Sequence, residues 1–385
     1  MPELEPSQPP AARPPATPMG EAERIACLRL IRSENVGPVT YRELIDHFGS
    51  ADAALAAVPE LSRRGGTRRM IRLCSRDEAE AELGRARAAG AEPLFTAEPA
   101  YPVPLAAIDP PPPLLYVKGD VRLLNRPTVA IVGARQCSAA GAKLARLFAT
   151  EIGRAGYVIA SGLARGIDSM AHRGALDCGT IAVLAGGIDV VYPPEHADLQ
   201  AEIGERGCLV TEMPMGFVPR GKDFPRRNRI VSGISLGVLI VEAARRSGSL
   251  VTARLAAEQG REVFAVPGHP LDPRAEGTNK LLKSGATLVT EPDDLLSALS
   301  PLTRSPTPLL REDAELAPPT PPPLSARDRD RVVAALGPAP IDVDSLVRGT
   351  GLAIRSVQVV LMELALAGRI ERHGGGLVSL NPVES

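Results

Sequence analysis

Positively charged residues crowd into one short segment, GKDFPRRNRIVSG, at residues 221–233. Only Asp223 offsets its four cations, which are Lys222, Arg226, Arg227 and Arg229. Guanidinium and ammonium groups are the side chains with which proteins hold phosphate oxygens, and arginine does so through two parallel hydrogen bonds. The segment therefore predicts a local site for phosphate, with a solvated basic loop as the alternative.

The composition of the whole chain limits what such a site can be. The 385 residues hold 44 Lys and Arg against 45 Asp and Glu, so the net charge is -1 and any anion site must be local. Aromatic residues make up 3% and tryptophan is absent, so a long platform for stacked bases is excluded. Phe224 and Tyr192 are the aromatics close to candidate turns, and each also fits a core position. Binding should depend mostly on contacts to a ligand's backbone.

Seven short apolar runs, separated by glycine-rich turns and amphipathic segments, indicate how the cations are positioned. The runs are TVAIVG (128–133), YVIASG (157–162), TIAVLAGG (180–187), CLVTEM (208–213), LGVLIVEA (236–243), EVFAVPG (262–268) and TLVT (287–290). This repeat is typical of an α/β fold with a doubly wound parallel sheet and crossover helices.

The turns after these strands should meet at one edge of the sheet. They are GARQCS (133–138), SGLARGID (161–168), AGGID (185–189) and RSGS (246–249). Ligands of open α/β sheets bind at the carboxyl ends of the strands, near helix N-termini. None of the turns is a GxGxxG or GxxxxGK[ST] motif. Their convergence favours an extended phosphate-binding surface over a single nucleotide pocket.

Four longer motifs carry a family resemblance. SGLARGIDSMAHRGAL, FPRRNRIVSGIS, SGSLVTARLAAEQGREVFAVPG and EGTNKLLKSGA follow one another between about residue 120 and residue 290. In this order they resemble the DprA/Smf family, bacterial DNA-processing proteins of natural transformation. The resemblance implies an extended Rossmann-like domain that binds single-stranded DNA, protects incoming DNA, forms a homodimer and loads the recombinase RecA. It implies neither a cofactor nor an enzymatic activity.

The candidate site combines the turns with the family's motifs. It consists of Gly133, Arg135, Ser161, Gly162, Lys222, Phe224, Arg226, Arg227, Asn228, Arg229, Ser247, Gly248, Ser249, Thr278 and Asn279. The resemblance makes Arg135 the main phosphate contact. Ala134 stands where the family has a serine, which removes one hydroxyl donor. Asn228 is also a good helix N-cap residue, and the two roles are compatible.

Two polar residues elsewhere have a plainer interpretation. Asp168 and His172 lie four positions apart, the spacing of an acid–base pair or of two metal ligands. No third ligand or nucleophile accompanies them, so we predict an N-cap carboxylate and a structural histidine. The five cysteines are far apart and lack a CxxC spacing. We therefore predict no metal and no catalytic residue.

Proline-rich segments suggest where the chain divides. We predict a disordered tail at 1–20, a small helical domain at 21–97, the extended Rossmann-like domain at 98–300, a proline-rich linker at 301–323 and a winged-helix domain at 324–385. In the helical domain, VGPVTYRELIDHFGS resembles a helix-hairpin-helix or SAM-like unit. The winged-helix pattern is not basic, which favours a protein-docking or auxiliary role over DNA reading.

Other functions remain open as alternatives. The related phosphoribohydrolases cleave nucleotides on a Rossmann core, but their PGGxGTxxE motif is absent here. A metabolite-sensing Rossmann module with a winged-helix output is a third possibility. No run approaches the ~20 apolar residues of a membrane span. Cysteine usage fits a reducing compartment, so we expect a cytoplasmic protein.

Overall fold

The computed structural model describes residues 19–67, 69–304 and 325–381. The predicted tail lies outside these residues except for Met19 and Gly20. Of the predicted linker, only residues 301–304 are described, and they end a helix. The domain boundaries therefore stay a proposal.

A nine-stranded sheet forms the centre of the chain, in the order β1-β2-β6-β5-β4-β3-β7-β8-β9. Its strands are β1 (Glu92–Phe95), β2 (Leu114–Gly119), β3 (Thr128–Val132), β4 (Val158–Ser161), β5 (Thr180–Val183), β6 (Cys208–Thr211), β7 (Gly237–Ile240), β8 (Glu262–Ala265) and β9 (Thr287–Leu288). Strands β3 to β9 are the seven predicted strands, and they pair in parallel. Strands β1 and β2, which the sequence did not predict, add an antiparallel edge beside β6.

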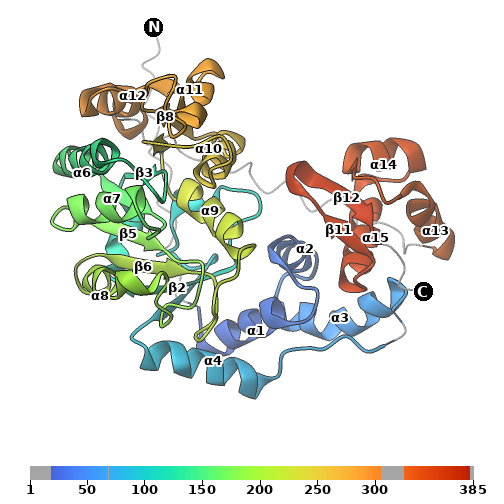
Figure 1. Cartoon of the computed structure of the whole chain (residues 1–385). Helices are drawn as coiled ribbons and strands as arrows, with labels where there is room; N and C mark the ends of the chain where they lie inside the picture. Colours follow the sequence, from blue (N-terminus) through green and yellow to red (C-terminus); the bar gives the residue numbers. More distant parts are fainter. Residues whose placement is uncertain (1–18, 68, 305–324, 382–385) are drawn as a thin grey trace, which may run out of the picture.

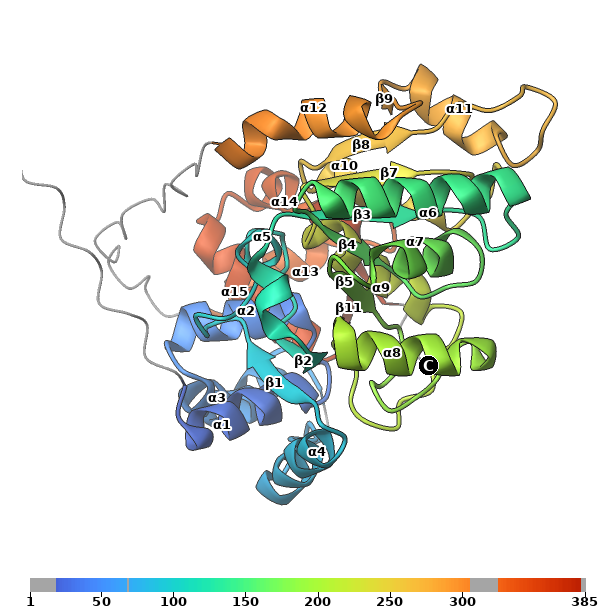
Figure 2. The same ribbon diagram turned by 90° about the vertical axis from the view of Figure 1, so that its left-hand side faces the viewer.

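Helices cover both faces of this sheet (Figure 2). They are α5 (Val103–Ala106), α6 (Ala139–Arg154), α7 (Ile167–Ala175), α8 (Ala197–Arg206), α9 (Asp223–Gly233), α10 (Ser249–Glu258), α11 (Glu276–Lys283) and α12 (Pro292–Arg304), with 3-10 turns at Val121–Asn125 and Pro194–His196. In β3, Val129 and Ile131 pack with α6, α7 and α12, whereas Ala130 and Val132 pack with α9 and α10. Side chains alternate between the faces with a period of two, so a strand buried on both sides is apolar throughout.

Four N-terminal helices pack on the antiparallel edge of the sheet. They are α1 (Glu21–Arg32), α2 (Pro38–Phe48), α3 (Ala51–Arg64) and α4 (Arg76–Ala88). Tyr116 of β2 belongs to the same hydrophobic core as Leu28 and Leu44. Its hydroxyl donates to Glu82 Oε1 at 2.6 Å, and Arg32 pairs with the same carboxylate at 2.8 Å. The helical segment and the sheet edge therefore share one core.

The C-terminal segment is a winged helix that docks on the N-terminal helices (Figure 1). It consists of α13 (Ala326–Ala335), β10 (Ile341–Asp342), α14 (Val343–Thr350), α15 (Ile354–Leu366), β11 (Ile370–Arg372), a 3-10 turn (Gly374–Gly376) and β12 (Leu377–Leu380). Asn35 Nδ2 donates to the Leu366 carbonyl at 3.0 Å, and Arg372 pairs with Glu43 at 2.7 Å. The third helix of helix-turn-helix proteins commonly reads DNA. Here α15 packs against α3 of the same chain, and the docking of another protein stays a prediction.

Within the described segments, no single helix is long and apolar enough to cross a membrane. Helices α14 and α15 reach that length and composition only as a pair, and they meet at a bend of 115°. Their buried side chains form the core of the winged helix.

Candidate nucleic-acid interface

A groove of about 930 Å³ opens at the carboxyl edge of the sheet. The turns after β3, β4 and β7 meet the start of α9 there, and a narrow recess adjoins it. The predicted site residues that line the groove are Gly133, Arg135, Phe224, Arg227, Asn228, Ser247, Gly248 and Ser249, while Gly162 lines the recess. Segments more than 100 positions apart in sequence are thus brought together at one surface.

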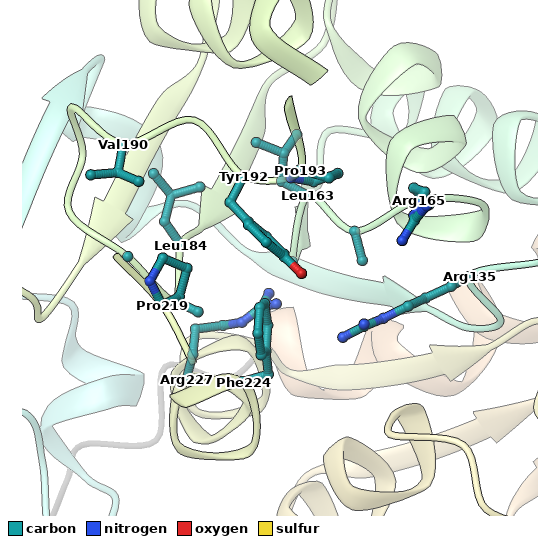
Figure 3. A pocket seen from close by; sticks show the side chains of 14 residues that line it. Arg135, Leu163, Arg165, Leu184, Val190, Tyr192, Pro193, Pro219, Phe224 and Arg227 are labelled. Carbon is teal, nitrogen blue, oxygen red and sulfur yellow. The ribbon is translucent and has the colours of Figure 1, made fainter. Parts of the chain in front are cut away.

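Arg135 is the exposed cation at the centre of this surface. Its guanidinium lies over the Phe224 ring, 5.1 Å from the centroid, and the Tyr192 ring is 5.2 Å from that of Phe224 (Figure 3). A β-carbon on Gly133 would come within 2.7 Å of Ile167 Cγ1, so only glycine lets this turn approach α7. The site therefore presents a cation beside an aromatic face, an arrangement that suits a phosphate next to a base.

Arg227 lies beneath the groove as a buried cation. The residue is 6% exposed, and Nη1 donates to the Val183 carbonyl at 3.0 Å. A β-carbon on Gly162 would lie 1.7 Å from the same nitrogen, so any side chain at this position would displace the Arg227 guanidinium. Desolvation lowers the pKa of Arg227 to about 10, against the opposing effect of the Asp168 charge. Arg227 remains charged at neutral pH and gives the groove a positive floor.

Asp168 is the buried carboxylate beside Arg227. It accepts the backbone N–H groups of Gly162 at 3.1 Å and Ala164 at 3.4 Å. Burial raises its pKa, and the Arg227 charge and these backbone donors lower it. The predicted N-cap role is wrong, because Gly166 is the N-cap of α7 and Asp168 lies inside the first turn. Asp168 instead holds the turn after β4 in place by accepting hydrogen bonds from the backbone of that turn.

Two cations of the predicted cluster point elsewhere. Arg226 and Arg229 both form ion pairs with Glu212, at 2.8 and 2.5 Å, and Arg229 also donates to the Pro110 carbonyl. Lys222 is exposed at the N-cap of α9, and neither it nor these two arginines lines the groove. The sequence suggests four mobile cations on one surface. The structure instead directs two of them to Glu212, a carboxylate at the end of β6.

The turn before α10 forms the opposite wall. The hydroxyls of Ser247 and Ser249 form a hydrogen bond of 2.7 Å, and Gly248 is the N-cap residue of α10. Asn228 Nδ2 donates to the Gly248 carbonyl at 3.4 Å and thereby links α9 to this turn. Asn228 lies in the interior of α9, so it does not serve as the N-cap that its residue type suggests.

Three predicted residues have their side chains engaged within the fold. Ser161 Oγ donates to the Ile131 carbonyl at 2.6 Å, which ties β4 to β3. Thr278 is buried and donates to the Ala275 carbonyl at 3.1 Å. Asn279 exchanges two hydrogen bonds with the backbone of Gly268. None of the three lines the groove.

The structure adds groove residues that the sequence prediction omitted. Arg165, Arg246 and Arg274 line the groove, and so does Tyr192. Arg165 is largely exposed and lies 3.4 Å from Glu195, while Arg274 is paired with Asp272 at 3.0 Å. Arg165 and Arg246 belong to the quoted turns SGLARGID and RSGS, so those turns already contained the signal.

His172 is structural, as predicted. It is fully buried, and Nδ1 lies 2.7 Å from Thr180 Oγ1, whose own hydrogen is donated to the Ile159 carbonyl. Nδ1 must therefore carry the proton. Burial lowers the pKa of His172 to about 3, so the ring is neutral at pH 7. Among the described residues, no group of three His, Cys, Asp or Glu side chains is placed to hold a metal.

This fold and site define an α/β protein with an open, cationic groove at the switch point of its sheet. Comparison with known families agrees: residues 92–300 match the model described as DNA recombination-mediator protein A. Residues 21–85 match the DprA-like N-terminal HHH domain, and residues 315–376 match the DprA winged helix domain. The chain belongs to the DprA/Smf family, which confirms the resemblance and the predicted fold class.

Individual relatives cover most of the chain. Protein Smf of Escherichia coli (strain K12) is 42% identical over 289 residues, which is 73% of this chain and 75% of that protein. The DNA processing protein DprA of Bacillus subtilis (strain 168) is 43% identical over 202 residues, 52% of this chain and 68% of that protein. The X-ray structure of DprA from Streptococcus pneumoniae superposes with a TM-score of 0.61 at 33% identity, covering 73% of this chain and 98% of that one.

Proposed function

We propose that this chain binds single-stranded DNA in the groove and acts in DNA processing as a binding protein rather than an enzyme. The observation that carries the proposal is the guanidinium of Arg135 over the Phe224 ring. A phosphate can pair with that cation while a neighbouring base contacts the aromatic face. Arg165 and Arg246 add positive charge along the same groove. Membership of a family whose relatives are named for DNA processing supports DNA as the ligand.

The shape of the groove favours a single strand over a duplex. Arg227 and Gly162 lie at its base, and helices α9 and α10 stand beside it. A single strand is flexible enough to bring its phosphates to recessed cations and to turn a base toward Phe224. A duplex holds its phosphates at fixed positions on a cylinder and keeps its bases stacked inside. Contacts to phosphate predominate, so sequence preference should be weak.

The further roles that we propose rest on the family resemblance. They are protection of incoming DNA, transfer of the bound strand to RecA and action as a homodimer through the Rossmann-like domain, in the cytoplasm. Light scattering of the purified chain tests the dimer. Co-elution of RecA with the chain, with and without single-stranded DNA, tests the transfer partner.

Fluorescence anisotropy with labelled oligonucleotides tests the central proposal. Single strands should bind more tightly than duplexes of the same length, and affinity should fall as salt rises. Equal affinity for the duplex would contradict the proposal. Release of free base from nucleoside monophosphates would instead support the phosphoribohydrolase alternative.

A further inference from the structure

Glu242 lies at the point of the sheet where many α/β proteins bind a phosphate. The strand order places β4 and β7 on either side of β3, and the helices that follow β3 and β7 lie on opposite faces. The crevice between β3 and β7 is therefore the topological switch point. In dinucleotide-binding folds, the pyrophosphate sits there against the N-terminus of the first helix, which here is α6.

The Glu242 carboxylate fills that place in this chain. Its Oε2 accepts the backbone N–H of Ser138 at 2.9 Å, and its Oε1 accepts the Ser138 hydroxyl at 2.5 Å. Ser138 is the N-cap of α6, and its hydroxyl in turn accepts the N–H of Gly141 at 2.9 Å. The two carboxylate oxygens thus occupy donors at the start of α6 that would otherwise face a phosphate.

Gly141 makes room for the carboxylate. A β-carbon at this position would lie 2.5 Å from Glu242 Cδ and 2.6 and 2.8 Å from its two oxygens. The first turn of α6 therefore forms a cradle of the size of a small anion, and a protein side chain occupies it. The carboxylate also places a negative charge at the positive end of a 16-residue helix.

We propose that Glu242 is a specificity-determining residue: it acts as an internal anion that excludes free phosphate and mononucleotides from the switch point. A phosphate at the start of α6 would have to displace this carboxylate or lie beside a like charge. The exposed cations Arg135, Arg165 and Arg246 remain accessible in the groove. The consequence for DNA rests on the proposed function: cellular nucleotides would compete poorly with a strand held by those cations.

The experiment is calorimetric titration of inorganic phosphate and of adenosine monophosphate into the full chain and four variants. Glu242→Ala should bind both ligands at least about tenfold more tightly than the unaltered chain, because the helix N-terminus is freed. Glu242→Ser is a second truncation with the same expected gain, in case the first loses its cooperative melt. Glu151→Ala is the matched control: it removes a carboxylate near the C-terminal end of the same helix, where it pairs with Arg154, and leaves the start of α6 capped.

The fourth variant tests the location. Glu242→Ala combined with Gly141→Ala should lose the gained binding, since the new methyl group fills the cradle while alanine favours the helix. The proposal is overturned if neither truncation gains affinity, if Glu151→Ala gains as much, or if the double variant keeps the gain. The titrations contain no DNA, so a failure to bind single strands would refute the proposed function without affecting this result.

Discussion

Replacing Arg135 with alanine should weaken single-strand binding without unfolding the protein. The arginine is exposed, and no hydrogen bond or ion pair holds its side chain among the described residues; its contact is with the Phe224 ring. An exposed cation–π contact is worth ~0.5–1 kcal/mol, so the free energy of unfolding should fall by at most about 1 kcal/mol. A charge-assisted hydrogen bond is worth ~1.5–3 kcal/mol, so affinity should fall roughly 10- to 150-fold.

The assay is fluorescence anisotropy with a labelled single strand at several salt concentrations. Loss of one phosphate contact should reduce the slope of log affinity against log salt by about 0.7. Arg226→Ala is the matched control, because it removes the same charge from a residue that pairs with Glu212 and does not line the groove. The slope of log affinity against log salt should be the same for Arg226→Ala as for the unaltered chain. The reasoning is refuted if Arg135→Ala keeps affinity and slope, or if Arg226→Ala reduces both equally.

Three further predictions concern the supporting structure. Arg227→Leu removes the hydrogen bond to the buried Val183 carbonyl and the positive charge that opposes the rise in the pKa of Asp168, so chemical denaturation should show a loss of about 1–3 kcal/mol, and an unchanged free energy of unfolding would be contrary. Because the pKa of His172 is about 3 in the folded chain, only the unfolded state gains its proton between pH 6 and 4. As the pH decreases from 6 to 4, the free energy of unfolding should therefore fall by about 1.4 kcal/mol per pH unit relative to that of His172→Gln. Equal pH profiles for the two proteins would contradict this. A β-carbon on Gly65, at the C-terminal end of α3, would lie 2.0 Å from the Glu363 carbonyl of α15. Gly65→Ala should therefore detach the winged helix from the N-terminal helices and increase the radius of gyration measured by X-ray scattering. An unchanged radius would count against this contact.

The parallel strands could be predicted because strands buried on both faces are continuous apolar runs followed by turns. The same reasoning missed β1 and β2, since EPLF and LLYVKG flank a proline-dense segment. They pair antiparallel with each other, and only β2 pairs with the distant strand β6. The turns of Arg135 and Ser247 were predicted to meet, and they do, because parallel strands place their carboxyl ends at one edge.

Side-chain direction was harder to predict than position. The sequence shows cations at 222–229, but it does not show that Glu212 lies opposite Arg226 and Arg229. Arg227 has the same residue type as its neighbours, yet its place on α9 turns it inward beneath Gly162. The pairing of an ion with a distant partner depends on tertiary packing, which local spacing does not contain.

The central claim is tested most directly by comparing how tightly single strands and duplexes bind. The comparison uses the unaltered chain and a triple variant that carries Arg135→Ala, Arg165→Ala and Arg246→Ala. Oligonucleotides of one length, titrated over a range of salt, give affinity and salt slope together. The unaltered chain should prefer the single strand, and the triple variant should lose that preference with a slope smaller by about 2, or 0.7 for each of three phosphate contacts. Tight, salt-dependent binding of single strands by a folded triple variant would contradict the claim that this groove holds the DNA.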